Sequence, residues 1–144
     1  MKYKNVTGFE HDMPENLGVL MLNLGTPEAP TPTAVRRYLA EFLKDPRVVE
    51  VPRPIWWLIL HGVILRVRPN RSAKAYQSVW TDRGSPLLDV ARRQAAGLHL
   101  LLKQRIGEGV RVELGMRYGN PSVPSALHEL REAGARRPVA LPLY

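Results

Sequence analysis

The chain has 144 residues, of which 44% are apolar, and this is enough for one domain with a hydrophobic core. It contains no cysteine, which excludes disulfides, thiolate metal ligands and a cysteine nucleophile. The formal net charge of +8 suits nucleic acid, an anionic membrane surface or an anionic small molecule, but the arginines are scattered, which argues against a nucleic-acid partner.

The first predicted elements are a polar N-terminal arm over residues 1–16 and a buried strand over residues 17–24. The strand is an almost unbroken apolar run, which is typical of a parallel strand covered on both faces. Gly25, Thr26 and Pro27 end it, and apolar residues at helical spacing predict a helix over 33–44. Thr31 or Thr33 is the expected helix cap, and residues 48–51 are expected to be a short extended piece.

Residues 52–67 form an apolar segment with basic residues at both ends. The segment is too short to span a bilayer as a helix. It is either a buried core helix, or a helix that lies on a membrane or forms an apolar lip over a pocket. Trp56 and Trp57 are adjacent and cannot both face one core, and tryptophan is favoured at membrane interfaces, so the lip is the preferred interpretation.

The second half of the chain alternates helices and strands without a hairpin signal. This pattern predicts an α/β fold, with a parallel sheet flanked by helices in a flavodoxin-like domain over 17–144. Because the chain ends at the carboxyl end of a buried strand, we expect a domain that is incomplete at its C-terminus, the front part of a longer enzyme. The predicted elements are a helix over 69–80, a helix over 85–106 with Ser85 as N-cap, a strand over 110–118, a helix over 121–133 and a buried strand over 138–143.

Candidate site residues lie where the predicted strands end, because ligands of open α/β sheets bind outside the carboxyl ends of the strands. Arg117 can hold a carboxylate or phosphate there, and Tyr118 can pack on a flat ligand. A second polar set, Arg68, Tyr76 and Ser85, lies beside the apolar segment. From the residues alone, Arg117 in a structural ion pair and the second set on a solvated helix face are equally good interpretations.

No complete catalytic or metal-binding set is present. The chain lacks a glycine-rich phosphate loop after the first strand and lacks the HExxH metalloprotease motif. His11, His61, His99 and His128 each stand alone, without a carboxylate or second histidine at ligand spacing. We therefore assign no catalytic residue, no metal ligand and no cofactor.

Five motifs in sequence order resemble the ferrochelatase family, most closely its proteobacterial type. They cover nearly the whole chain after the arm, and jointly they are highly specific. They are Gly-Val-Leu-Met-Leu-Asn-Leu-Gly-Thr-Pro-Glu (18–28), Tyr-Leu-Ala-Glu-Phe-Leu-Lys-Asp-Pro-Arg-Val-Val (38–49), Tyr-Gln-Ser-Val-Trp-Thr-Asp-Arg-Gly-Ser-Pro-Leu (76–87), Gly-Met-Arg-Tyr-Gly-Asn-Pro (115–121) and Leu-Pro-Leu-Tyr (141–144).

The resemblance implies that the full-length protein inserts Fe²⁺, as substrate, into protoporphyrin IX to form protohaem, the last step of haem biosynthesis. It implies two similar α/β halves, with the family's catalytic histidine and glutamate beyond Tyr144, so this chain alone is expected to be inactive. By the same resemblance, Leu24 lies against the porphyrin face, although many relatives have tyrosine or methionine there. The other implied porphyrin-binding residues are Arg68, Tyr76, Ser85, Arg117 and Tyr118, with residues 52–67 as the lip.

The resemblance also implies a cytoplasmic location, with peripheral contact to the inner membrane through residues 52–67 as a further option. Two alternatives remain open. One is a flavodoxin-like binding module for a nucleotide or another flat anionic ligand, and the other is a basic peripheral-membrane protein. A chelatase for cobalt or nickel shares the expected fold, but the lip and the 76–87 stretch favour ferrochelatase.

Overall fold

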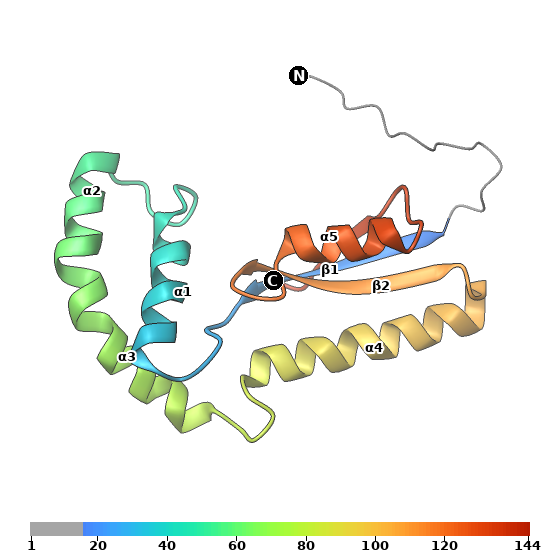
Figure 1. Ribbon diagram of the computed structural model, residues 1–144, viewed down its shortest axis with the longest axis horizontal. Helices are drawn as coiled ribbons and strands as arrows, with labels where there is room; N and C mark the ends of the chain where they lie inside the picture. The colour runs from blue at the N-terminus through green and yellow to red at the C-terminus, as the bar shows by residue number, and fades with distance from the viewer. Residues whose placement is uncertain (1–15) are drawn as a thin grey trace.

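The computed structural model describes residues 16–144, which form a parallel three-stranded sheet flanked by helices (Figure 1). The strand order is β2-β1-β3, and both neighbours of β1 run parallel to it. This confirms the predicted fold class. The elements in chain order are β1 (Leu17–Gly25), α1 (Pro32–Lys44), α2 (Arg53–Ile59), η1 (Leu60–Ile64), α3 (Leu65–Val79), α4 (Pro86–Ile106), β2 (Val110–Tyr118), α5 (Val123–Glu132) and β3 (Val139–Pro142).

Helices cover both faces of the sheet at β1 and β2. On one face, Met21 and Met116 pack with Ala91 and Ala95 of α4, and all four are buried. On the opposite face, Leu20 packs with residues of α5. Figure 1 shows α4 and α5 on opposite sides of the strands. Because both faces of β1 are covered, its sequence had to be continuously apolar, as predicted.

The last strand differs from its prediction. Residues 139–142 do form β3, paired with β1 from Val19 to Leu22, but every residue of β3 is exposed. The prediction of a buried strand is therefore wrong for the structure as it stands. The reason is that α4 and α5 lie over β1 and β2, and no described element covers either face of β3.

The first helices form a separate layer beside the carboxyl ends of the strands (Figure 1). Helix α1 is capped by Thr31, whose Oγ1 accepts a hydrogen bond from the Ala34 backbone N–H at 3.3 Å. The chain then turns through residues 46–48 instead of forming the predicted extended piece, because the backbone N–H groups of Val48 and Val49 donate to the Asp45 carbonyl.

Residues 53–79 form one continuous helical run, where the sequence predicted two helices separated near Pro69. The middle of the run, η1, is a π-helical segment that ends directly before Leu65. A proline ring clashes with the carbonyl four residues before it, which for Pro69 is the carbonyl of Leu65. The wider π turn gives the helix room at that point, so Pro69 bends the run without ending it.

Helix α4 begins at Ser85–Pro86 as predicted. Ala91 and Ala95 are buried against the strands, and Leu88, Leu98 and Leu102 pack beside them. Leu87, Val90 and Leu101 lie on the other side of the helix and are exposed by 38%, 43% and 48%.

The predicted arm lies outside the described residues except for its last member. Asn16 forms a parallel bridge with Ala135, and its side-chain amide donates to the Ala133 carbonyl at 2.6 Å. This contact ties the start of β1 to the loop between α5 and β3. The division at residue 16 between an arm and a domain stays a prediction.

Candidate functional site

The carboxyl ends of β1 and β2 meet at Gly25 and Tyr118, which are paired in the sheet. Gly25 has a φ of 115°, and a Cβ at this position would lie 1.9 Å from the Tyr118 carbonyl oxygen. Only glycine fits here, because it has no side chain and tolerates a positive φ. The close approach sends the chain directly from β1 towards α1, so residues after Gly25 lie at the end of both strands.

A buried pair of hydroxyl groups follows Gly25. Thr26 Oγ1 donates to Ser85 Oγ at 2.9 Å, and both residues are 5% exposed. Ser85 occupies the N-cap position of α4 as predicted, but its side chain makes no capping hydrogen bond. Its oxygen instead joins the start of α4 to the end of β1.

Arg117 and Tyr118 both bind Asp45, the residue that ends α1. The Arg117 guanidinium lies 2.5 Å from Asp45 Oδ2, and the Tyr118 hydroxyl donates to the same oxygen at 3.0 Å. The other carboxylate oxygen accepts from the Arg47 backbone N–H at 2.9 Å. These hydrogen bonds, first that of Arg47 and then that of Arg117, lower the pKa of Asp45 to about 2. Arg117 thus forms a structural ion pair, which was one of its two interpretations, and its role in porphyrin binding stays a prediction.

Aromatic rings join this end of the sheet to the helical layer. The Tyr118 ring packs edge-to-face on Phe42 with centroids 5.1 Å apart, and the Tyr38 hydroxyl donates to the Gly25 carbonyl at 3.3 Å. Burial, the largest cause, raises the pKa of Tyr38 to about 12, so this hydroxyl stays a donor. Leu24 and Tyr76 pack against the same apolar cluster.

The structure brings most of the predicted site residues to one region. Leu24, Tyr76 and Tyr118 share the apolar cluster between the sheet and the helices. Ser85 lies next to the end of β1 through its bond to Thr26. Arg68 differs from these four because its side chain is exposed on α3, outside the apolar cluster.

Two grooves open beside these strand ends. A groove of about 290 Å³ is polar and includes Glu28, Glu41 and Asn120. A second groove of about 470 Å³ includes Trp80, Arg83, Ser85, Arg92 and Pro121. Of these residues the sequence singled out only Ser85. Trp80 and Arg83 lie inside the 76–87 motif, and this location could have identified them as candidate site residues. Nothing in the sequence around Arg92 marks it as one.

No group of three or more histidine, aspartate or glutamate side chains within residues 16–144 is placed to hold a metal ion. His61 and His99 each have one buried ring nitrogen without a hydrogen-bond partner, and the Trp57 ring lies 5.1 Å from the His61 ring. His128 lies 4.0 Å from Glu132 on the surface, and His11 lies outside the described residues. Within the described residues, the histidines therefore belong to no group of three possible metal ligands.

Comparison with known proteins shows where this architecture belongs. A family model described as ferrochelatase matches residues 16–144, which is the entire described part of the chain. The chain belongs to the ferrochelatase family. It is 61% identical over its whole length to a ferrochelatase of Thioalkalivibrio sulfidiphilus and 58% identical to one of Marinobacter nauticus, covering 39% of each. It is also 60% identical over 128 residues to "Ferrochelatase 2" of Shewanella oneidensis, covering 39% of that protein.

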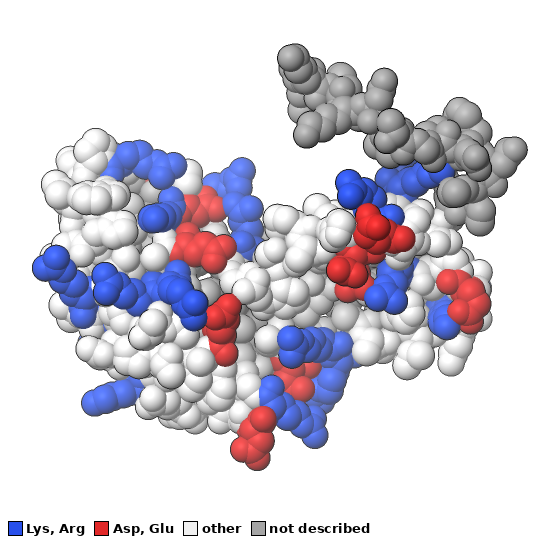
Figure 2. Space-filling view, in the orientation of Figure 1, with Lys and Arg blue, Asp and Glu red and all other residues white. Residues whose placement is uncertain are grey.

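The chain thus spans about two fifths of the length of these curated relatives. The match to ferrochelatases over all of residues 16–144 confirms the family inferred from the five motifs and does not favour a flavodoxin-like nucleotide module. On the face shown in Figure 2, the basic side chains form separate groups with acidic residues between them.

Proposed function

We propose that this chain forms one wall of the porphyrin pocket of an enzyme that inserts Fe²⁺ into protoporphyrin IX to form protohaem. The observation that carries the proposal is the match of residues 16–144 to the ferrochelatase family, together with the clustering of Leu24, Tyr76 and Tyr118 at the carboxyl ends of the strands. This is the edge of an open α/β sheet at which ligands bind.

The residues at this edge suit a flat, largely apolar ligand with anionic groups. Leu24 and Tyr76 are half-buried and offer apolar surface for a macrocycle face. Arg68 is exposed and makes no ion pair within residues 16–144, so its guanidinium is available for a propionate. Arg117 and Tyr118 are held by Asp45 and give the wall its shape.

Metal insertion requires a macrocycle bent from planarity, so that nitrogen lone pairs meet the iron, and a base for two departing protons. A rigid wall that binds one face while arginines hold the propionates supplies distortion from binding energy remote from the reacting atoms. The described residues supply the wall, and the carboxylates beside it, Glu28, Glu41 and Asp45, are already held in hydrogen bonds. The proposed role of this chain is therefore binding and distortion, and on its own it does not insert iron.

Residues 52–67 are the proposed lip, and we extend their role to peripheral membrane contact. Its outward side chains include Ile55, Trp57 and Leu58, exposed by 55%, 58% and 64%. Arg53 and Arg66 at its two ends suit anionic head groups. No helix in residues 16–144 is long and apolar enough to cross a membrane. From the exposed apolar side chains and flanking arginines, together with the family resemblance, we propose a cytoplasmic protein at the surface of the inner membrane.

Porphyrin binding and iron insertion by the full chain test the proposal together. Porphyrin is expected to quench tryptophan fluorescence saturably, and Arg68→Gln is expected to weaken binding about tenfold by removing one charge-assisted contact. Arg105→Gln is the matched control and should bind as the wild type does, because Arg105 is exposed at the C-terminal end of α4, outside the lip, and makes no ion pair within residues 16–144. Absence of saturable quenching would overturn the binding role, and iron insertion above the uncatalysed rate would overturn the proposed inactivity of the chain alone.

A further inference from the structure

The groove of about 470 Å³ beside Ser85 carries two arginines that the porphyrin-binding set above does not include. Arg83 comes from the turn between α3 and α4, and Arg92 comes from the second turn of α4. Neither guanidinium makes an ion pair or hydrogen bond to any residue in 16–144. The acidic residue in the groove, Glu28, is already bound by Arg37 and Asn120, each at 2.9 Å. The groove therefore holds two uncompensated positive charges.

Arg83 is held in place by its backbone. Thr81 and Gly84 bridge each other with hydrogen bonds of 3.1 Å and 2.9 Å, which closes a tight turn around Arg83. The Arg83 backbone N–H also donates to Thr81 Oγ1 at 3.3 Å. A side chain on a closed turn loses less conformational freedom when it binds a ligand than one on an open loop.

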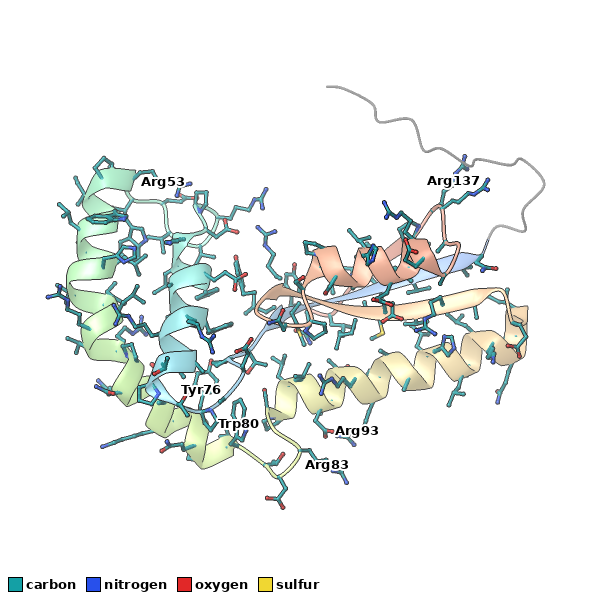
Figure 3. All side chains as sticks on the ribbon, viewed as in Figure 1. Arg53, Tyr76, Trp80, Arg83, Arg93 and Arg137 are labelled. Carbon is teal, nitrogen blue, oxygen red and sulfur yellow. The ribbon has the colours of Figure 1, made fainter. Side chains whose placement is uncertain are left out.

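An aromatic ring lies in the same groove. Trp80 is half-buried and packs edge-to-face on Tyr76 with centroids 6.3 Å apart. Figure 3 shows Tyr76 and Trp80 side by side at the end of α3, with Arg83 on the turn that leads into α4. The groove is thus continuous with the proposed porphyrin wall, since Tyr76 belongs to that wall and Ser85 lines the groove.

We propose that Arg83 and Arg92 bind a carboxylate of the porphyrin in this groove, with the edge of the macrocycle against Trp80. The inference rests on the proposed function and adds an anionic subsite to it. A guanidinium matches a carboxylate with two parallel N–H···O bonds, and two guanidinium groups in one groove select a ligand with an acidic edge. The N-terminus of the 21-residue helix α4 opens at Ser85 without a side-chain cap, and its positive end favours the same charge.

The test compares mesoporphyrin IX, a dicarboxylic acid, with its dimethyl ester in one detergent, by titrating the Soret absorbance shift of the full chain. The variants are Arg83→Gln, Arg92→Gln and their double variant. Arg93→Gln is the matched control because Arg93 neighbours Arg92 on α4, does not line the groove and is paired with Asp89 at 3.1 Å. Circular dichroism checks that each variant is folded.

Each groove variant is expected to weaken binding of the acid about tenfold, or ~1.4 kcal/mol, and to leave the ester unchanged. The ratio of acid to ester affinity should therefore fall in the groove variants and stay at the wild-type value in Arg93→Gln. If the two arginines have only a structural role, their replacement should weaken binding of the acid and of the ester equally, and this result would overturn the inference. If the wild type binds porphyrin and the groove variants keep its acid preference, the subsite is wrong and the proposed function stands. If the wild type binds neither ligand, the proposed function fails and the subsite with it.

Discussion

The lip offers the sharpest test of the structure, because two leucines two residues apart have opposite surroundings. Leu60 is 1% exposed and packs in the cluster between α1 and α3, whereas Leu58 is 64% exposed. Replacing Leu60 with alanine removes three buried carbons, about 0.8 kcal/mol each, and leaves a cavity, so the free energy of unfolding should fall by ~3 kcal/mol. The same change at Leu58 should alter it by less than about 0.5 kcal/mol.

Membrane binding should show the reverse order. If Leu58 enters the interface of an anionic vesicle, its loss removes part of the ~2.4 kcal/mol of apolar transfer and weakens binding about tenfold. Leu60 faces the protein and should change vesicle affinity little while the variant is folded.

Urea unfolding measures the free energy of unfolding of each variant, and co-sedimentation with vesicles of phosphatidylglycerol and phosphatidylcholine measures its membrane affinity. The packing argument is refuted if Leu60→Ala costs less than about 1 kcal/mol. The membrane proposal is refuted if the wild type does not sediment with the vesicles or if Leu58→Ala sediments as well as the wild type.

Three further predictions concern the strand ends. The pKa of Asp45 is lowered from 3.8 to about 2, so its stabilising contribution is present above its ordinary pKa and is lost as pH falls towards 2. In Asp45→Asn, the urea concentration at the unfolding midpoint should therefore fall less steeply with decreasing pH below about pH 4 than it does in the wild type. If the midpoints of variant and wild type fall in parallel with pH, the prediction is wrong. Ser85→Ala leaves the Thr26 hydroxyl buried without its partner, so the free energy of unfolding in urea should fall by ~1–2 kcal/mol. Adding Thr26→Val removes the unpaired hydroxyl and should restore part of that loss. If the double variant recovers no stability, the hydroxyl pair is not the cause. Gly25→Ala places a Cβ 1.9 Å from a carbonyl oxygen of β2 and should abolish the cooperative thermal transition, whereas Gly62→Ala, with open space around it, should retain the transition.

The sequence was sufficient for the elements whose signals are local. The apolar run over 17–24 predicted β1 because a strand covered on both faces must be apolar throughout. Pro86 after Ser85 located the start of α4 because proline fits the first helical position. Pro69 misled the prediction because the preceding π turn, which accommodates the ring, has no recognisable pattern in the residues.

Features that depend on distant contacts could not be predicted. One such feature is the side of α4 that faces the sheet, because leucines occur on both sides of this helix: Leu98 and Leu102 pack against the strands, whereas Leu101 is exposed. The partner of Arg117 is 72 residues away in the sequence, so its ion pair with Asp45 follows only from the fold. The sequence left open whether Arg117 binds a ligand or forms a structural ion pair, and the structure shows the ion pair.

The contacts around Asp45 also explain how the wall keeps its shape. Asp45 ends α1, Tyr118 ends β2, and the hydroxyl of Tyr118 donates to Asp45 at 3.0 Å. Close by, the Glu41 carboxylate of α1 accepts from the backbone N–H of Gly119 at 3.0 Å. Each contact joins the helical layer to the end of the sheet, so α1 cannot move relative to β2 without breaking both.

The arginines near this wall differ in whether they already bind a carboxylate of the protein. Arg117 is committed to Asp45, which makes it a poor anchor for a ligand carboxylate unless the ligand displaces Asp45. Arg68, Arg83 and Arg92 make no ion pair within residues 16–144 and can meet a carboxylate without breaking a contact. Under the proposed function, the free energy of ligand binding would then bend the macrocycle, because the strand ends resist deformation. Breaking the Asp45 contacts should therefore weaken porphyrin distortion before it weakens porphyrin binding, because the anchors remain and the wall behind them yields.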